Sequence, residues 1–530
     1  MIMDLASGLP AIVVGSLGLF ILYNLWWTIC SHKTEGKLLV RQPSGALPFI
    51  GHLHLLRAQQ TGARTLAALA DKYGPVFTIR LGRSHACVVS SPEAVKDCFT
   101  INDKVFADRP RSNAGTYLAY DHAGFGFASY GAYWLEIRKL ALVGLFSVHR
   151  LASLKQVRAS EVNAFIKNLY LFCKKNEQVP HQNISVGPRL EVLVVNMMVR
   201  MIAGKRYFTG ADGEVHEEAK RLIKLIKEFA SVLATTAVSE VFPFLKWMDK
   251  WSNQVKSMKR ISKEMESLIE TWVDEHKLKK LKTEENNSNQ DFIDVMLSTI
   301  KDGHAMSGHT REKIIKATIT MLIIAGIDTT AIAMTWILSN LMNNRHALKR
   351  AQQELDLKIG RDRWAEDSDI EKLNYLQAII KETFRLYPPV PMLMPHVLRE
   401  DCCVSGYHIP QGTRLFVNAW KLHRDPRVWS NPEEFEPERF LTSHRNVDVL
   451  GRNFELTPFG SGRRSCPGIK WTLQAVHLTM ARLLQGFDLT TPLDAPVDMT
   501  ESQGASATMP KATPLELVLT PRLPPHLYHL

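Results

Sequence analysis

The feature that most constrains this chain is an uncharged, apolar run near its N-terminus. No Asp, Glu, Lys or Arg occurs from Leu5 to Cys30, a run of 26 residues. At about 1.5 Å per residue, a helix of that length exceeds the roughly 30 Å apolar core of a bilayer. Basic residues follow the run from Lys33 onward, whereas only Asp4 precedes it. The positive-inside bias therefore predicts that residues 1–31 are a single-span anchor with the following chain in the cytosol. A buried core helix is the alternative.

The composition is that of an ordinary globular protein with excess positive charge. Of 530 residues, 45% are hydrophobic and 22% are charged, which excludes a disordered chain. The formal net charge of +12 favours an anionic partner, such as a membrane surface or an acidic protein. We expect no nucleic-acid partner, because no basic cluster with interleaved aromatic residues occurs. Seven sparse cysteines suit neither a zinc site nor a disulfide framework, which indicates a reducing compartment.

The rest of the sequence predicts a short connector followed by one large domain. Residues 32–51 are basic and rich in proline, which predicts a stiff hinge before a folded domain of residues 52–530. The run Val76–Leu81 and the apolar run that follows it predict a β-hairpin. From about residue 132 to residue 344 the apolar periodicity is mostly helical, with a surface loop expected at Lys277–Gln290. The pattern therefore predicts one mainly helical α+β domain with small sheets.

One cysteine near the C-terminus stands out by its surroundings. Cys466 follows a segment that contains glycines and two arginines, and it precedes a helical run that begins at Ile469. A lone cysteine is most often a small buried hydrophobe. Here nearby positive charge and a helix N-terminus are expected to lower the pKa of the thiol. The glycines leave room for a large planar group, and a thiolate is the axial ligand with which haem iron promotes O–O cleavage.

The segment around Cys466 resembles the haem-binding signature of the cytochrome P450 monooxygenases. The matching positions are Phe459, Gly462, Arg464, Cys466 and Gly468. The resemblance extends over about residues 40–520. It implies the cytochrome P450 fold, a helix-rich domain with small β-sheets, and haem b held by the Cys466 thiolate. It also implies that Phe459, Arg464 and Gly468 bind the haem.

A second motif lies in an apolar helical stretch from Thr320 to Leu341. Gly326 inside this helix costs about 1 kcal/mol relative to alanine, and buried Asp328 and Thr329 side chains need partners. A kink in a core helix is the alternative. The resemblance implies the family's oxygen-activating helix, in which Thr329 hydrogen-bonds dioxygen and Asp328 supplies protons through water.

The resemblance also predicts a role for a pair of opposite charges, Glu382 and Arg385. Glu382 and Arg385 are three residues apart and share one helical face, a pair that on a surface contributes a few tenths of a kcal/mol. The resemblance adds Arg439 and implies a buried network that braces the haem-binding loop. These three residues are thus expected to act in folding and haem loading.

Trp134 and Arg138 are four residues apart and also share a helical face, where simple stacking is the alternative. The resemblance implies that both bind the haem propionates, together with Arg464. His396 occupies a position where the family often has a basic propionate ligand, although a lone histidine is more often incidental.

The substrate pocket is expected from position in the chain. The expected lining spans are Val390–Leu393, parts of Arg109–Ser129, Glu240–Phe244 and Gly504–Ala507. Their largely apolar composition favours a small lipophilic substrate. The last of these spans has small residues where the family pattern leads us to expect Gly-Leu-Thr, which implies a roomier pocket and an unusual substrate.

Three short segments resemble the plant eighty-two family of P450s: Phe106–Pro110, Tyr130-Gly131 and Trp420–Pro426. The resemblance implies oxygen insertion into an alkaloid, terpenoid or flavonoid, with O2 and NADPH as co-substrates. Nothing resembles a flavin or NADPH site, so a separate NADPH-cytochrome P450 reductase is the expected partner, with cytochrome b5 as a further candidate. The predicted location is the endoplasmic reticulum membrane. Desaturation, ring coupling, C–C cleavage and a non-catalytic haem protein are the alternatives.

Overall fold

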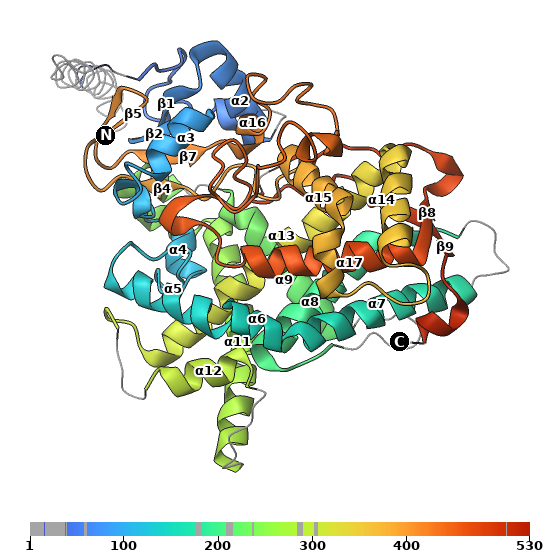
Figure 1. Ribbon diagram of the computed structural model, residues 1–530. Coiled ribbons are helices and arrows are strands. Elements are labelled where there is room, and N and C mark those ends of the chain that lie inside the picture. The colour runs from blue at the N-terminus through green and yellow to red at the C-terminus, as the bar shows by residue number, and fades with distance from the viewer. Residues whose placement is uncertain are drawn as a thin grey trace, which may run out of the picture.

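The computed structural model describes most of the folded body (Figure 1). The described residues are 15, 18, 38, 40–57, 61–175, 182–207, 216–235, 238–282, 290–301, 306–504 and 506–529. The predicted anchor at residues 1–31 therefore lies almost entirely outside the described residues. The described part of the predicted hinge packs against the first strand: Gly51 pairs with Leu81, and the Thr78 N–H donates to the Arg41 carbonyl at 2.9 Å.

Helices make up most of the described chain. The α-helices are α2 (Gly62–Tyr73), α3 (Pro92–Phe99), α4 (Asn113–Tyr117), α5 (Ala132–Gly144), α6 (Val148–Ser153), α7 (Lys155–Lys175), α8 (Val186–Ala203), α9 (Glu217–Leu233), α10 (Val238–Val241), α11 (Asn253–Lys282), α12 (Phe292–Thr299), α13 (Arg311–Asn343), α14 (Arg345–Lys358), α15 (Asn374–Leu386), α16 (Ala419–Leu422) and α17 (Ile469–Gly486). The 3-10 helices are η1 (Leu55–Arg57), η2 (Val105–Ala107), η3 (Pro243–Lys250), η4 (Asp367–Lys372), η5 (Pro437–Phe440), η6 (Gly462–Arg464), η7 (Pro492–Asp494) and η8 (Pro525–Tyr528).

Local sequence explains where several helices begin and end. The Ser91 side chain caps α3 and Pro92 occupies the first helical position, where its missing N–H is not needed. Thr310 caps α13 in the same way. Helix α8 ends at Gly204, whose φ of 63° is left-handed. A Cβ at Gly204 would also stand 3.0 Å from Asp291 Oδ2, so glycine suits this stop.

The strands form three small sheets, and the largest lies to one side of the helical mass (Figure 1). The strands are β1 (Val76–Leu81), β2 (Ser84–Val89), β3 (Ile184–Ser185), β4 (His396–Val397), β5 (Cys402–Val404), β6 (Tyr407–Ile409), β7 (Arg414–Val417), β8 (Phe487–Thr490) and β9 (Glu516–Pro521). The sheet orders are β1-β2-β7-β4, β3-β9-β8 and β5-β6. Strands β1 and β2 pair antiparallel with Val76 opposite Val89, which confirms the predicted hairpin. Strand β2 then pairs in parallel with β7, with Ala86 opposite Arg414.

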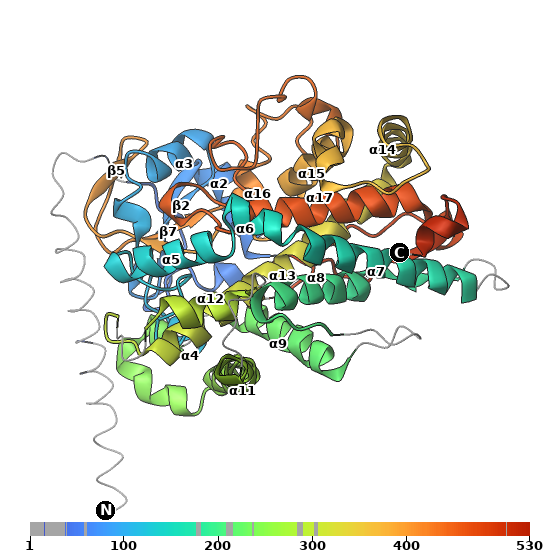
Figure 2. The ribbon, with the colours of Figure 1, turned by 60° about the horizontal axis from the view of Figure 1, so that its bottom comes forward.

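Helix α13 crosses the centre of the helical part, packed between α8, α9, α11, α15 and α17 (Figure 2). Its residues are apolar on most sides, as expected for a helix surrounded by others. Among the described residues it is the one helix long and apolar enough to cross a membrane, but 72% of its most apolar window is buried inside the protein. We therefore assign it to the core, where it forms one wall of the site.

The predicted surface loop at Lys277–Gln290 is partly wrong. Helix α11 continues through Lys282, and residues 283–289 lie outside the described part of the chain. Lysine and leucine are good helix formers, so a lysine-rich segment extends a helix that is already nucleated. The buried His276 side chain also fastens this end of the helix to Asp291, with a distance of 2.6 Å between Nε2 and Oδ2.

Candidate active site

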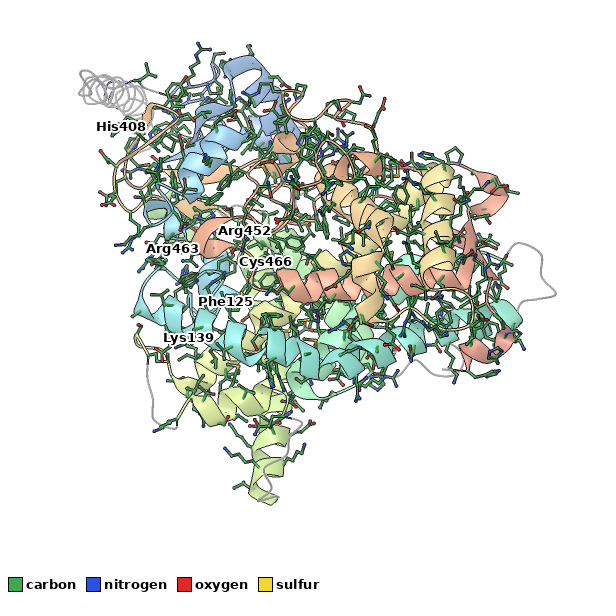
Figure 3. The ribbon with its side chains drawn as sticks, in the orientation of Figure 1. Phe125, Lys139, His408, Arg452, Arg463 and Cys466 are labelled. Carbon is green, nitrogen blue, oxygen red and sulfur yellow. The ribbon has the colours of Figure 1, made fainter. Side chains whose placement is uncertain are left out.

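A cavity of about 300 Å³ lies between α13 and the loop that carries Cys466. Figure 3 shows Cys466 in the interior, near Phe125 from the segment between α4 and α5. Helix α13 contributes Ala325, Gly326 and Thr329 to the opposite wall. Most of the lining is apolar, and the cysteine and the Gly326 segment of α13 border the same space. Cys466 and this segment of α13 therefore face one shared cavity.

The Cys466 loop is a tight turn closed by its own backbone. The Cys466 N–H donates to the Phe459 carbonyl at 2.9 Å. Gly460 and Gly462 have φ values of 71° and 66°, and a Cβ at Gly462 would stand 2.3 Å from Asp103 Oδ1. These two glycines are therefore required by backbone conformation and a close neighbour. Gly460 and Gly468 also line the cavity, so the expectation that glycines leave room for a planar group stays a prediction.

The expected low pKa of the Cys466 thiol is wrong. Burial raises the pKa of this thiol, and the Gly468 N–H and the Arg138 charge oppose the rise without overcoming it. Charges and helix ends seen in sequence favour the thiolate, but sequence does not show how deeply the sulfur is buried. A bound metal ion would stabilise the thiolate form of Cys466, which burial disfavours.

Three arginines gather at one edge of the cavity without any acidic partner. Arg109, Arg138 and Arg464 all line it, and within the described ranges none of the three forms an ion pair. Burial, followed by the charge of Arg109, lowers the pKa of Arg464 to about 8, and burial lowers that of Arg109 to about 10. Their guanidinium groups donate to backbone carbonyls, as Arg138 does to Ser465 at 2.6 Å. Three cations without acidic partners are suited to bind the two propionate carboxylates of haem. This cluster is the observation that shows that the site residues fit the cofactor.

Arg109 belongs to an expected lining span and lines the cavity, but its role as a buried cation beside Arg138 and Arg464 was not predicted. Its Nη1 donates to the Met394 and Pro395 carbonyls, both at 2.7 Å, and its Nε donates to the Gly126 carbonyl. Its place in the segment Phe106–Pro110 was the available signal for this role.

Trp134 and His396 also border the cavity, with different donor properties. Trp134 Nε1 donates to the Phe125 carbonyl at 3.1 Å, and its ring lies under the Arg464 guanidinium at 4.3 Å. His396 Nδ1 lies 2.7 Å from the Phe106 carbonyl, so this nitrogen carries the proton. Burial and the Arg109 charge hold the pKa of His396 well below its usual range. His396 is therefore neutral beside the arginines. To act as the expected basic ligand, it would need a carboxylate nearby that raises its pKa.

Asp328 and Thr329 lie on the cavity side of α13. The Thr329 hydroxyl donates to the Ala325 carbonyl one turn earlier, at 2.6 Å, which fixes the direction of its oxygen. Asp328 Oδ2 accepts a hydrogen bond from the Thr508 hydroxyl at 2.8 Å. Burial raises the pKa of the Asp328 carboxyl, and the bond from Thr508 partly offsets that rise. An acid with a raised pKa beside a hydroxyl suits proton transfer.

Glu382, Arg385 and Arg439 form a buried network away from the cavity. Arg385 Nε and Nη2 donate to Glu382 Oε2 and Oε1 at 2.7 and 2.8 Å, and Arg439 Nε donates to Oε1 at 3.1 Å. The three side chains are 0%, 0% and 2% exposed. Arg385 also donates to the His423 carbonyl, and His423 Nε2 accepts the Thr457 N–H at 3.0 Å. The network is thereby connected to the segment that enters the Cys466 loop.

One expected stretch of the pocket is wrong. Among the side chains that the structure describes, none from Glu240–Phe244 lines the cavity, whereas α9 contributes part of the wall. The α9 residues that line it are Ile226, Phe229, Ala230 and Leu233. Their spacing of i, i+3, i+4 and i+7 marks the apolar face of an amphipathic helix, which was a usable signal in the sequence. Parts of the other three expected spans do line the cavity, including Phe125, Val390 and Ala507.

Comparison with known proteins decides the family. The family model described as Cytochrome P450 matches residues 41–517 of this chain. The chain belongs to the cytochrome P450 family. Cytochrome P450 CYP82J17 of Trigonella foenum-graecum is 46% identical over 530 residues, covering 99% of this chain and 100% of that protein. Xanthotoxin 5-hydroxylase CYP82C2 of Arabidopsis thaliana is 48% identical over 492 residues, covering 92% and 93%.

Other comparisons agree with this assignment. Nicotine N-demethylase CYP82E3 of Nicotiana tomentosiformis is 45% identical over 524 residues, covering 97% of this P450 and 99% of that protein. A zebra fish cytochrome P450 solved with progesterone superposes with a TM-score of 0.73 at 24% identity, covering 87% of this chain and 100% of that one. The predicted fold class and the plant eighty-two family are confirmed. The protein is an oxidoreductase that binds haem through a cysteine thiolate and uses O2 and NADPH.

Proposed function

We propose that this P450 inserts one oxygen atom from O2 into a small lipophilic plant metabolite of the alkaloid, terpenoid or flavonoid class. The observation that carries the proposal is the apolar cavity with Cys466 on one wall and Asp328 and Thr329 on the other. The names of its relatives support a small plant metabolite as substrate, since they include a xanthotoxin 5-hydroxylase, nicotine N-demethylases and a protopine 6-monooxygenase.

The proposed roles follow from the contacts of each side chain. Bound haem, held by the Cys466 thiolate, supplies the activation of O2. The propionates would be held by Arg138 and Arg464, with Arg109 and Trp134, whose donors bond backbone carbonyls at this edge of the cavity. His396 faces the same edge, while Phe459 and Gly468 shape the loop beside the sulfur.

On the opposite wall, Asp328 takes a proton from water and passes it into the cavity. The Thr329 oxygen, fixed by its bond to Ala325, orients the group that receives the proton. The apolar lining from α9 excludes bulk water and holds the substrate near this wall.

A patch of exposed aromatic side chains supports membrane association. Phe49, Phe244, Trp247 and Trp251 are between 54% and 67% exposed. We call these four residues the aromatic patch. Tryptophan and phenylalanine at such exposure favour the interface between a bilayer and water.

The residue after Phe49 and the segment that leads to Phe244 meet at the turn between β1 and β2. The Gly82 N–H donates to the Ile50 carbonyl at 3.1 Å, and a Cβ at Gly82 would stand 2.3 Å from Val241 Cγ1. Phe49, in the hinge, and the segment that begins the other three aromatic residues are therefore close to each other. We propose that residues 1–31 anchor the protein in the endoplasmic reticulum, residues 32–51 connect, and residues 52–530 rest in the cytosol with this patch on the bilayer.

Basic residues near Cys466 support docking of an acidic electron donor. Lys139, Arg452 and Arg463 are exposed and lie around the side of the molecule that holds the Cys466 loop (Figure 3). Arg463 is paired with Asp103 at 3.1 Å, so Lys139 and Arg452 carry most of the free charge of this group. Positive charge at this position would steer a negatively charged partner towards the haem edge. The proposed partner is NADPH-cytochrome P450 reductase, with cytochrome b5 as a second donor on the same side.

The carbon monoxide complex of the reduced protein tests the proposed function. We expect the thiolate band that gives the family its name, and its loss in Cys466→Ser while Cys173→Ser, a half-buried cysteine outside the cavity, retains it. Consumption of NADPH should require added reductase. Titration with xanthotoxin, nicotine and protopine should then show a spin-state shift for compounds that enter the cavity. A normal carbon monoxide band in Cys466→Ser would remove the basis of the proposal.

A further inference from the structure

The loop of residues 506–509, near the C-terminus, makes a direct polar contact with α13, the expected oxygen-activating helix. The Thr508 hydroxyl donates to Asp328 Oδ2 at 2.8 Å. The Ser506 oxygen lies 3.3 Å from the Thr508 oxygen and accepts the Thr508 N–H at 3.2 Å. Both Ala507 and Thr508 line the same cavity as Asp328. The loop thus supplies a hydroxyl where the helix presents its acid.

Three separate elements hold this loop in place. The Ala507 N–H donates to the Ala230 carbonyl of α9 at 3.1 Å. On the other side of Thr508, the Met509 N–H donates to the Pro389 carbonyl at 2.9 Å, and Trp336 Nε1 of α13 donates to the Met509 carbonyl at 2.8 Å. Because the backbone is fixed on both sides, the Thr508 hydroxyl has a defined position relative to α13.

We propose that Thr508 is a positioning residue that holds the Asp328 carboxylate in the orientation needed for proton transfer. This inference rests on the proposed function, in which Asp328 delivers protons. One carboxylate oxygen, Oδ2, is bound to the loop, which leaves Oδ1 to exchange a proton with water in the cavity. Without the hydroxyl, the side chain is free to rotate about its terminal bond, and the acid loses its fixed direction.

The Thr508 hydroxyl is the main group that offsets the effect of burial on the pKa of Asp328. Burial raises the pKa of Asp328, the Thr508 hydrogen bond lowers it, Glu191 raises it and Lys227 lowers it. Glu191 on α8 and Lys227 on α9 form an ion pair at 2.7 Å, so their effects on Asp328 oppose each other. Removal of the Thr508 hydroxyl therefore leaves burial with less to offset it, and the carboxyl holds its proton to higher pH.

The test compares Thr508→Val with Thr508→Ser in the full-length, haem-loaded protein with added reductase. The probe is the compound that gives the largest spin-state shift in the panel above. We expect Thr508→Val to lower the product formed per NADPH by about tenfold and to increase hydrogen peroxide release. Thr508→Ser should restore coupling because it keeps the hydroxyl. Thr513→Val is the matched control, since Thr513 also donates to an aspartate, Asp498, at an exposed position.

A second readout needs no substrate. The infrared stretch of carbon monoxide bound to the reduced protein reports polar groups in the cavity, so its titration with pH should follow Asp328. We expect the midpoint in Thr508→Val to move up by about one pH unit, the size expected for one hydrogen bond to a charged group. Thr508→Ser and Thr513→Val should leave the midpoint in place.

The outcomes separate this inference from the proposed function. Wild-type coupling and titration in Thr508→Val would overturn the positioning role, as would a Thr508→Ser variant as impaired as Thr508→Val. Effects of Thr508→Val and Asp328→Asn that add in full in the double variant would also overturn it, because the two residues would then act independently. Wild-type coupling in Asp328→Asn would instead refute proton delivery by Asp328, and the positioning role with it.

Discussion

The buried Glu382 network gives the sharpest stability prediction. Glu382 accepts two hydrogen bonds from Arg385, one from Arg439 Nε and one from the Glu436 N–H at 2.9 Å. Glu382→Gln keeps the shape of the side chain and removes its charge. Two guanidinium groups, 0% and 2% exposed, would then remain buried without their central counter-charge.

The expected magnitude follows from burial. Removal of one partner from a buried ion pair destabilises a protein by about 3–5 kcal/mol, because the remaining charge stays desolvated. A whole domain has a free energy of unfolding of only about 5–15 kcal/mol, so the change is a large share of it. Arg385 is connected by hydrogen bonds through His423 to Thr457, in the segment that enters the Cys466 loop. We therefore expect weak haem loading as well as lower stability.

A matched control is present on the surface. Glu217 and Lys220 also form a pair three residues apart on a helix, at 2.6 Å, but their side chains are 85% and 53% exposed. We expect Glu217→Gln to leave both properties unchanged. The assays are denaturant unfolding and the carbon monoxide band per unit of protein. If Glu382→Gln unfolds at the same denaturant concentration as Glu217→Gln, the reasoning from burial is refuted.

Three further predictions concern the cavity and α11. Thr329→Ala should keep its haem and carbon monoxide band while product per NADPH falls by about tenfold, and unchanged coupling would exclude its assigned role. Arg109→Met should retain haem about tenfold less tightly, yet stabilise the haem-free protein by removing a buried cation; haem transfer to a competing apoprotein and unfolding measure the two effects. His276 places both ring nitrogens against acceptors, the Trp272 carbonyl and Asp291. Burial disfavours its protonation, but the bond and charge of Asp291 raise its pKa above 6.5. Its stabilisation is therefore complete below pH 6.5 and disappears as pH rises through the folded pKa, so the unfolding deficit of His276→Gln should shrink from pH 6 to pH 9.

Features that depend on short stretches of sequence were predictable. The hairpin of β1 and β2 and the helix after Cys466 follow from local periodicity, and the structure has both. The Cys466 motif also placed the cavity, because its residues lie within ten positions of one another. The network at Glu382 needed the family resemblance, since Arg439 is far along the chain.

Features that depend on burial or on backbone acceptors were not predictable. The pKa of Cys466 is raised because its surroundings are dry, which the neighbouring arginines in the sequence do not reveal. Arg109 binds only carbonyl groups of distant residues, and carbonyl groups carry no sequence signal. The contact of Thr508 with Asp328 joins positions 180 residues apart and depends on how the last loop folds back.

The parallel pairing of β2 with β7 has a consequence for synthesis of the chain. More than 300 residues separate Val89 from Arg414, yet these strands are neighbours in one sheet. At about 5–20 residues per second, the ribosome needs roughly 15 to 65 s to deliver the second strand after the first. During that interval one edge of the nascent hairpin presents unpaired amide and carbonyl groups to other chains. Chaperone supply and translation speed should therefore control the yield of this enzyme in a foreign host.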